Sequence, residues 1–183
     1  MLFIQFTGLS GAGKSTLSKG VAERLTTLGY RVEVLDGDRY RRHLWPELTF
    51  SAQDRQENIR RLGFIGQRLV HHGVIVILAA INPYKSVRDE LAVLMPGSRL
   101  VFIDCALPTL QQRDTKGLYA RALLPQAHAD HITNLTGVND PYDRPETPDL
   151  HIDTSTETRE ASEQRLLNAL LTWLKTTSSD DVN

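Results

Sequence analysis

The sequence has only one cysteine, Cys105, among 183 residues. A single cysteine excludes an intramolecular disulfide and any metal site built from several cysteines, and it suits a cytoplasmic location. The chain also lacks an excess of charge of either sign, because 21 basic and 22 acidic side chains leave a formal charge of −1. A near-neutral chain has no strong field that would attract a polyanion, so we expect neither a nucleic-acid partner nor a membrane partner.

Long apolar stretches are missing as well. The longest apolar run, Val74 to Ile81, is far shorter than the roughly 20 residues that a membrane-spanning helix needs. The first residues show no basic segment of a signal peptide and read at once as a strand. Hydrophobic residues make up 40% of the chain, which is ordinary for a globular protein. We therefore expect one domain over residues 1–176 and a flexible polar tail over residues 177–183.

Short apolar runs alternate with segments of helical periodicity. Strands are expected at residues 2–7, 31–35, 74–80, 99–105 and 150–153. Helices are expected at residues 14–28, 51–73, 86–95 and 157–175. The run at 74–80 is rich in β-branched residues, which is typical of a strand covered on both faces. The alternation predicts an α/β fold of three layers, with a parallel sheet between two layers of helices.

The stretch from about residue 108 to residue 148 has a different character. It contains several prolines and many charged residues, and its helical pieces are short. Long irregular segments inside a domain often act as lids. Since parallel sheets bind ligands beyond the carboxyl ends of their strands, we expect this stretch to be a lid over such a site.

A glycine-rich segment, Gly8 to Ser15, matches the phosphate-loop (Walker A) pattern G-x-x-x-x-G-K-[S/T] completely. It follows a predicted strand and opens a predicted helix, which is the context the motif requires. Backbone amides of such a loop surround the β- and γ-phosphates, Lys14 bridges them, and the Ser15 hydroxyl binds Mg²⁺. The predicted ATP contacts are Gly8, Ser10, Gly11, Ala12, Gly13, Lys14, Ser15 and Thr16.

Other features of the sequence indicate which class of phosphate-loop protein this is. The sequence has no Asn-Lys-x-Asp motif, with which regulatory GTPases recognise guanine. It is also too short for most ATPases that carry a second domain. A small phosphate-loop protein with a lid is most simply a kinase for a small acceptor.

Charged residues follow the second predicted strand and recur in the next helix. Asp36 and Asp38 lie just past the strand end, where a carboxylate can accept the proton of an attacking hydroxyl or hold a Mg²⁺-bound water. Arg41 follows them, while Arg55 and Asn58 share one helical face because they are three residues apart. Arginine binds anionic oxygens in a bidentate manner, so this concentration predicts an anionic acceptor.

Several segments together resemble one family, adenylyl-sulfate kinase, which phosphorylates the 3′-hydroxyl of adenosine 5′-phosphosulfate. They occur in the family's order over almost the whole chain. These segments are GLSGAGKST at Gly8–Thr16, DGD at Asp36–Asp38, FSAQDRQENIRR at Phe50–Arg61, NPY at Asn82–Tyr84, RDTKGLYARA at Arg113–Ala122 and LTGVNDPYDRPETPDL at Leu135–Leu150. The resemblance implies a phosphate-loop kinase fold, ATP with Mg²⁺, and a homodimer.

The resemblance also implies roles on the acceptor side. Asp36 looks like the family's candidate base near the ribose hydroxyl, and Phe50 looks like one face of an aromatic clamp on the acceptor adenine. From the residues alone, packing of Phe50 on the first turn of the helix is equally open. Arg41, Arg55 and Asn58 look like ligands for the phosphosulfate and the adenosine.

In the expected lid, Arg113 resembles an arginine near the ATP phosphates. The segment from Lys116 to Leu118 resembles the part that closes over both substrates. The full set of expected substrate contacts is Asp36, Asp38, Arg41, Phe50, Arg55, Asn58, Asn82, Lys116, Gly117, Leu118 and Leu135.

Two residues depart from the family pattern. Asn82 stands where members often have a serine that accepts phosphate in some of them, and an asparagine cannot accept it. Leu135 stands where the second aromatic of the clamp is usual, which bears on the affinity for the acceptor and on its identity.

Two alternatives to the adenylyl-sulfate kinase therefore stay open. The first is a kinase of the same fold that acts on another anionic nucleotide conjugate, for which Leu135 is the hint. The second is a non-catalytic nucleotide-binding subunit of a sulfate-activating complex. The intact Lys14, Ser15 and Asp36 argue against the second alternative.

Overall fold

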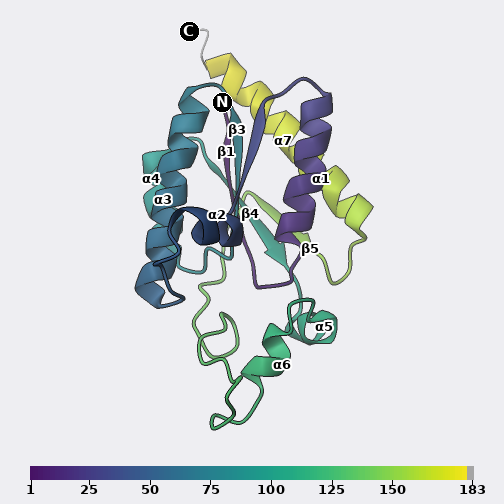
Figure 1. Cartoon of the computed structure of the whole chain (residues 1–183). Helices are drawn as coiled ribbons and strands as arrows, with labels where there is room; N and C mark the ends of the chain where they lie inside the picture. Colours follow the sequence, from purple (N-terminus) through teal and green to yellow (C-terminus); the bar gives the residue numbers. More distant parts are fainter. Residues whose placement is uncertain (181–183) are drawn as a thin grey trace.

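Five parallel strands form one sheet, in the order β2-β3-β1-β4-β5 (Figure 1). The computed structural model describes the backbone of residues 1–180 and the side chains of residues 1–176. The strands are β1 (Phe3–Thr7), β2 (Val32–Asp36), β3 (Ile75–Ala79), β4 (Arg99–Asp104) and β5 (Leu150–Asp153). The sequence predicted all five strands and the parallel sheet, and both are confirmed.

Helices cover both faces of the sheet (Figure 1). Helices α1 (Lys14–Thr27) and α7 (Arg159–Asp180) pack on one face, and α3 (Ala52–His71) and α4 (Lys85–Leu94) pack on the other. The tail expected at 177–183 begins inside α7, and residues 181–183 lie outside the described residues.

The core is divided between the two faces by the alternation of side chains along the central strands. In β3, Ile75 and Ile77 belong to the cluster under α1 and α7, whereas Val76 and Leu78 belong to the cluster under α3 and α4. Every residue of β1 and of β3 is buried. This burial on both faces explains why β3 appears in the sequence as a continuous apolar run, whereas β1 also buries Gln5 and Thr7.

The helix ends agree with local signals in the sequence. Gly29, just after α1, adopts φ +89°, which is the left-handed conformation of a glycine cap. The Ser51 hydroxyl accepts a hydrogen bond from the Asp54 amide (3.1 Å) at the start of α3. The Asp54 carboxylate binds the Thr49 amide (2.9 Å), so it secures the loop before the helix.

One further helix, α2 (Gly37–Leu44), was not predicted. Its sequence, GDRYRRHL, is rich in charge and has only Tyr40 and Leu44 as large apolar residues. The helix forms because the Asp36 carboxylate at the end of β2 accepts hydrogen bonds from the amides of Asp38 and Arg39. Asp36 is therefore the N-cap of α2 and a member of the site.

Most of the segment between β4 and β5 lies beyond the carboxyl ends of the strands (Figure 1), and its last residues return along the sheet to Arg99 and Leu100 at the start of β4. It contains the short helices α5 (Leu107–Arg113) and α6 (Leu118–Ala122), and turns and irregular chain form most of the rest. We call residues 108–148 the lid segment. In the part of the chain that the structure describes, no helix is long and apolar enough to cross a membrane.

Candidate active site

The phosphate loop joins β1 to α1 at the carboxyl edge of the sheet. Its glycines are required by geometry: Gly13 has φ +100°, and a Cβ on Gly8 would lie 2.1 Å from the Ile103 carbonyl oxygen. Two side chains from distant elements secure the loop. The Tyr119 hydroxyl donates to the Ser10 carbonyl (2.8 Å), and the Thr154 hydroxyl donates to the Ala12 carbonyl (3.0 Å).

Lys14 lies inside this loop and is buried. Its ammonium donates to the carbonyls of Gly8 (2.8 Å) and Leu9 (2.7 Å). Burial, followed by repulsion from Lys116, lowers the pKa of Lys14 to about 8. An anionic ligand in the loop would favour the charged form of this lysine.

Asp36 lies beside the phosphate loop. The Ser15 hydroxyl donates to its Oδ2 (2.9 Å), while its Oδ1 holds the first amides of α2. A hydroxyl and a carboxylate are oxygen ligands of the kind that Mg²⁺ prefers. Among the described residues there is no group of three or more His, Cys, Asp or Glu that could hold a metal. Ser15 and Asp36 therefore fit a Mg²⁺ ion that takes further ligands from substrate phosphates and water.

A cavity of about 260 Å³ opens beside the loop, and a second one of about 580 Å³ adjoins it under the lid segment. The two share Arg41, Phe50 and Arg55, among other residues. The expected site residues around the first cavity are Ser10, Gly11, Gly13, Lys14, Ser15, Thr16, Asp36, Asp38, Arg41, Phe50, Arg55, Asn58, Asn82 and Lys116. Leu118 and Leu135 line the second cavity.

Arg55 is held by residues on both sides of the site. Its Nε donates to the Phe50 carbonyl (2.8 Å), and its two terminal nitrogens donate to the Asn134 carbonyl and the Thr136 hydroxyl in the lid segment. Nη1 lies 3.8 Å from the Asp140 carboxylate. Arg55 is thus a rigid cation that joins α3 to the lid segment.

Phe50 forms a layer with two guanidinium groups. The central carbon of Arg41 lies 4.9 Å from the ring centroid, and that of Arg55 lies 5.8 Å from it. Burial lowers the pKa of Arg41, which donates to the Thr49 carbonyl. The Phe50 ring is 54% exposed and lines both cavities. This exposure favours a ligand contact over packing on the first turn of the helix.

Asn58 is buried, and its side chain makes structural contacts at the cavity wall. Its Oδ1 accepts a hydrogen bond from the Trp45 indole (2.6 Å), and its Nδ2 lies 3.5 Å from the Gly37 carbonyl. It therefore connects α3 to both ends of α2. Trp45 was not predicted to belong to the site, because it lies in no motif.

Asn82 lies in the turn after β3, in the left-handed conformation (φ +46°), and it is 1% exposed. Its Nδ2 donates to Gln5 (3.1 Å). Within the described part of the chain, its Oδ1 has no hydrogen-bond partner although it is buried. Since Asn82 lines the first cavity, this oxygen is suited to accept a hydrogen bond from a ligand.

The lid segment reaches the core through Lys116, whose ammonium pairs with the Asp38 carboxylate (2.7 Å). Burial acts to raise the pKa of Asp38, but the hydrogen bond and the charge of Lys116 outweigh it and hold that pKa below its usual value. Gly117 begins α6 with φ +63°. Gly137 of the lid segment packs closely on Leu9 of the phosphate loop, since a Cβ there would lie 2.5 Å from it.

Arg113 lies beside the phosphate loop. It donates to the Thr154 carbonyl (2.8 Å) and contacts the Cys105 sulfur (3.6 Å). Because Thr154 also binds Ala12, Arg113 borders the loop through the segment after β5. Its contact with ATP stays a prediction.

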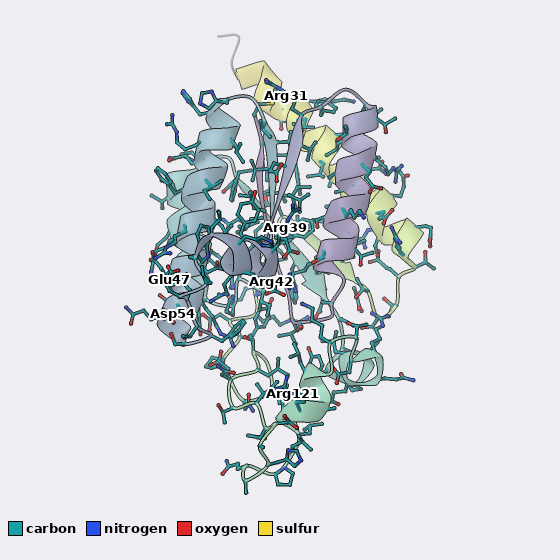
Figure 2. The ribbon with its side chains drawn as sticks, in the orientation of Figure 1. Arg31, Arg39, Arg42, Glu47, Asp54 and Arg121 are labelled. Atoms are coloured by element: carbon teal, nitrogen blue, oxygen red, sulfur yellow. The ribbon has the colours of Figure 1, made fainter. Side chains whose placement is uncertain are left out.

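Other residues of the site were not singled out from the sequence, although Arg121 lies in the family-like segment Arg113–Ala122. Arg42 on α2 and Arg121 on α6 line the second cavity from elements that are distant in sequence (Figure 2). Ile132 and Asn134 line it as well. These residues lie in charged or irregular stretches, where no periodicity separates a cavity wall from an exposed surface.

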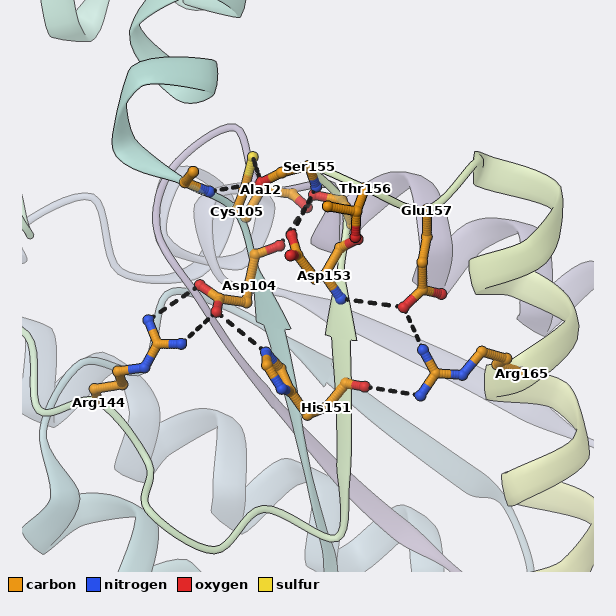
Figure 3. A network of polar contacts seen from close by, with 12 residues as sticks. Ala12, Asp104, Cys105, Arg144, His151, Asp153, Ser155, Thr156, Glu157 and Arg165 are labelled. Carbon is orange, nitrogen blue, oxygen red and sulfur yellow. Dashed lines mark hydrogen bonds and ion pairs between the residues drawn. The ribbon is translucent and has the colours of Figure 1, made fainter.

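The lid segment returns to the core at Tyr142, Asp143 and Arg144, which we call the lid root. Arg144 pairs with Asp104 at the end of β4, and His151 of β5 donates to the same carboxylate (3.1 Å) (Figure 3). Arg144 also lies over the Phe102 ring, 4.8 Å from its centroid. The root is thereby fixed to the sheet edge.

The model of the adenylylsulphate kinase family matches residues 1–153 of this sequence. The chain belongs to this family. As a member it is an ATP-dependent kinase, and the phosphate-loop kinase fold expected from the sequence is confirmed.

Individual relatives support the same family assignment. An adenylyl-sulfate kinase from Synechococcus sp. (strain JA-3-3Ab) is 50% identical over 147 residues, which cover 80% of this chain and 81% of the relative. One from Chloroflexus aurantiacus is 48% identical over 153 residues, which cover 84% and 80%. The solved structure of a Mycobacterium tuberculosis APS kinase in complex with AMPPNP and APS is 36% identical, with a TM-score of 0.82 over 92% of this chain and 96% of that one.

Proposed function

We propose that this protein transfers the γ-phosphate of ATP to the 3′-hydroxyl of adenosine 5′-phosphosulfate (APS). The products are ADP and 3′-phosphoadenosine 5′-phosphosulfate, the activated sulfate donor. The observation that carries this proposal is the position of Asp36. It lies between the phosphate loop, where Ser15 contacts it, and the cavity lined by Arg41 and Arg55.

On the ATP side, the loop amides and Lys14 bind the β- and γ-phosphates. Mg²⁺, held at Ser15, would neutralise charge that develops on the transferred phosphoryl group. Phosphoryl transfer depends mainly on such positioning and electrostatic stabilisation.

On the acceptor side, Arg41 and Arg55 bind the phosphosulfate, and Phe50 and Leu135 enclose the adenine. The carboxylate of Asp36 accepts the proton of the 3′-hydroxyl as the new O–P bond forms and the bond from the γ-phosphorus to the β,γ-bridging oxygen breaks. Asn82 has no hydroxyl, so phosphate passes directly between substrates at this position. The lid segment excludes water and limits wasteful hydrolysis.

The decisive experiment incubates the protein with MgATP and APS and follows the products by ³¹P spectroscopy. We expect one 3′-phosphorylated product for each ADP. A 3′-deoxy analogue of APS should bind without giving a transfer product. Transfer of phosphate to that analogue, or no transfer to APS itself, would contradict the proposal.

The two alternatives predict other outcomes. A kinase for another nucleotide conjugate would turn over ATP with a different acceptor from a panel, and a non-catalytic subunit would bind ATP without turnover. The homodimer and the cytoplasmic location also stay proposals, supported respectively by the family resemblance and by the single cysteine. Sedimentation of the purified protein tests the first of these.

A further inference from the structure

Arg88 of α4 is a buried cation behind the site, 3% exposed. Its contacts are carbonyl oxygens: Nη1 donates to Asn82 (2.8 Å) and Nη2 donates to Asp143 (2.6 Å). Among the described residues no carboxylate pairs directly with it, and the Asp143 carboxylate accepts a hydrogen bond from the Lys85 amide (2.8 Å). Burial lowers the pKa of Arg88. Burying a guanidinium without a directly paired carboxylate is costly, and the hydrogen bonds to these two carbonyls offset that cost.

The two carbonyls belong to two functional segments. Asn82 forms the acceptor-side turn after β3, and Asp143 belongs to the lid root. The Asp143 amide also donates to the Pro83 carbonyl (2.9 Å). Arg88 therefore fixes the distance between the turn and the place where the lid segment rejoins the core.

The same turn reaches the phosphate loop. The Gly8 amide donates to the Ile81 carbonyl (3.2 Å), and the Thr7 hydroxyl lies 2.9 Å from that oxygen and 3.1 Å from the Asn82 carbonyl. Tyr142 of the lid root contacts the Thr7 hydroxyl (3.0 Å). Burial raises the pKa of Tyr142 to about 12, so this contact persists over the physiological range of pH.

The orientation of the Asn82 side chain depends on this network as well. The Gln5 Nε2 donates to the backbone carbonyl of Arg88 (3.1 Å). This bond directs the Oε1 of Gln5 toward the Asn82 amide nitrogen. With Nδ2 occupied, the buried Oδ1 of Asn82 stays without a partner among the described residues, in a residue that lines the first cavity. Gln5, Asn82 and Arg88 are all nearly inaccessible to solvent, so water cannot replace these bonds.

We propose that Arg88 is a positioning residue that ties the acceptor-side turn to the lid root, so that acceptor binding and lid closure occur in one geometry. The inference rests on the proposed function and adds to it a residue that touches neither substrate. Its loss should displace the turn and loosen the lid root, while the phosphate loop, held also by Tyr119 and Thr154, should keep its affinity for ATP. Small displacements of this kind strongly lower the rate of phosphoryl transfer.

The test compares Arg88→Met, Arg88→Lys and a matched control, Arg60→Met, in the full chain. Arg60 of α3 also connects to α4, through an exposed ion pair with Glu90 (2.6 Å), but it lies away from the cavities. For each variant we would measure the melting temperature, the affinity for an ATP analogue, kcat and the KM for APS, and the ratio of ADP to transfer product.

For Arg88→Met we expect an APS KM higher by about tenfold, a lower kcat and a ratio of ADP to product well above one, with ATP-analogue affinity within about twofold of wild type. Arg88→Lys should recover part of this loss, because an ammonium still donates to one carbonyl. Tyr142→Phe removes a single hydroxyl of the same network. It should shift KM and the ratio in the same direction by about two- to fivefold, which keeps the inference testable if Arg88→Met does not fold.

A change in melting temperature alone, with kinetics equal to those of Arg60→Met, would show a merely structural role and overturn the inference. A parallel loss of ATP affinity would also overturn it, because the effect would then lie in the phosphate loop. If the wild-type protein forms no product from APS, the proposed function fails and the inference with it. If wild type forms product and the Arg88 and Tyr142 variants match the control, the inference alone fails.

Discussion

The phosphate loop and the acceptor cavity are both suited to bind an anion, but the loop is one continuous segment and the cavity is formed by several separate segments. The loop uses consecutive residues, Gly8 to Ser15, at the junction of β1 and the first turn of α1. The cavity brings together α2, α3, the turn after β3 and the lid segment. A site made of consecutive residues can be identified from a motif, whereas a dispersed one depends on how separate elements pack.

The two regions also hold charge differently. In the loop a single lysine is buried among backbone amides, and its pKa is lowered to about 8. In the cavity, the arginines are supported by carbonyls and an aromatic ring, and Lys116 pairs with Asp38. Changes in the loop should therefore abolish activity, and single changes around the cavity should have graded effects.

The largest effect is expected from Lys14→Ala. The charge that bridges the β- and γ-phosphates is lost where negative charge develops, so no phosphoryl transfer should be detected. The rate of product formation from MgATP and APS measures this loss of activity. Lys19→Ala, on the exposed side of α1, is the control. Turnover within tenfold of wild type would exclude this loop as the catalytic one.

Asp36→Asn should lower kcat by about 10²–10⁴ if the carboxylate acts as base or holds the metal. Asparagine is also a good N-cap, so α2 should persist and ATP affinity should change much less. Steady-state kinetics and the melting temperature separate these effects. An unimpaired enzyme would place the reacting centre elsewhere.

Raising the pH should weaken ATP binding. The pKa of Lys14 in the folded protein is about 8, below its usual value. The ammonium of the ligand-free protein therefore loses its proton as pH rises through 8, whereas bound phosphates favour the charged form. Affinity should fall by about tenfold between pH 7 and pH 9. Calorimetry across this range measures it. In Lys14→Arg, whose charge does not titrate, the fall should be much smaller. An equal fall in both proteins would contradict this origin.

The smallest effect is expected from Leu135→Phe. Leu135 and Phe50 line the same cavity, and an aromatic pair adds about 0.5–1.5 kcal/mol beyond burial of area. APS should bind about two- to tenfold more tightly, with ATP affinity nearly unchanged. Phe50→Ala should weaken binding by more.

Calorimetry with a non-hydrolysable ATP analogue bound is the measurement, and Leu123→Phe, at an exposed position just after α6, is the control. Unchanged or weaker binding of APS to Leu135→Phe would show that Leu135 does not face the adenine or that the acceptor is not an adenylyl compound. In the second case, the kinase for another nucleotide conjugate becomes the better proposal.

The sequence by itself determined the features whose cause is local. Apolar runs indicated the strands because burial of the sheet favours apolar side chains, most completely in β3. The phosphate loop was complete because its function needs particular residues at adjacent positions. The spacing of Arg55 and Asn58 placed both on one helical face, and both are buried there.

Only the tertiary structure decided which partners the site residues contact. It formed α2 from a charged segment, because Asp36 at the end of β2 supplies the cap. It placed Arg55 against Asn134 and Thr136, which lie about eighty positions further along the chain. The contacts of Arg88 likewise could not be inferred in advance, because its partners are backbone carbonyls. A carbonyl is present at every position, so only the fold decides which one a buried guanidinium reaches.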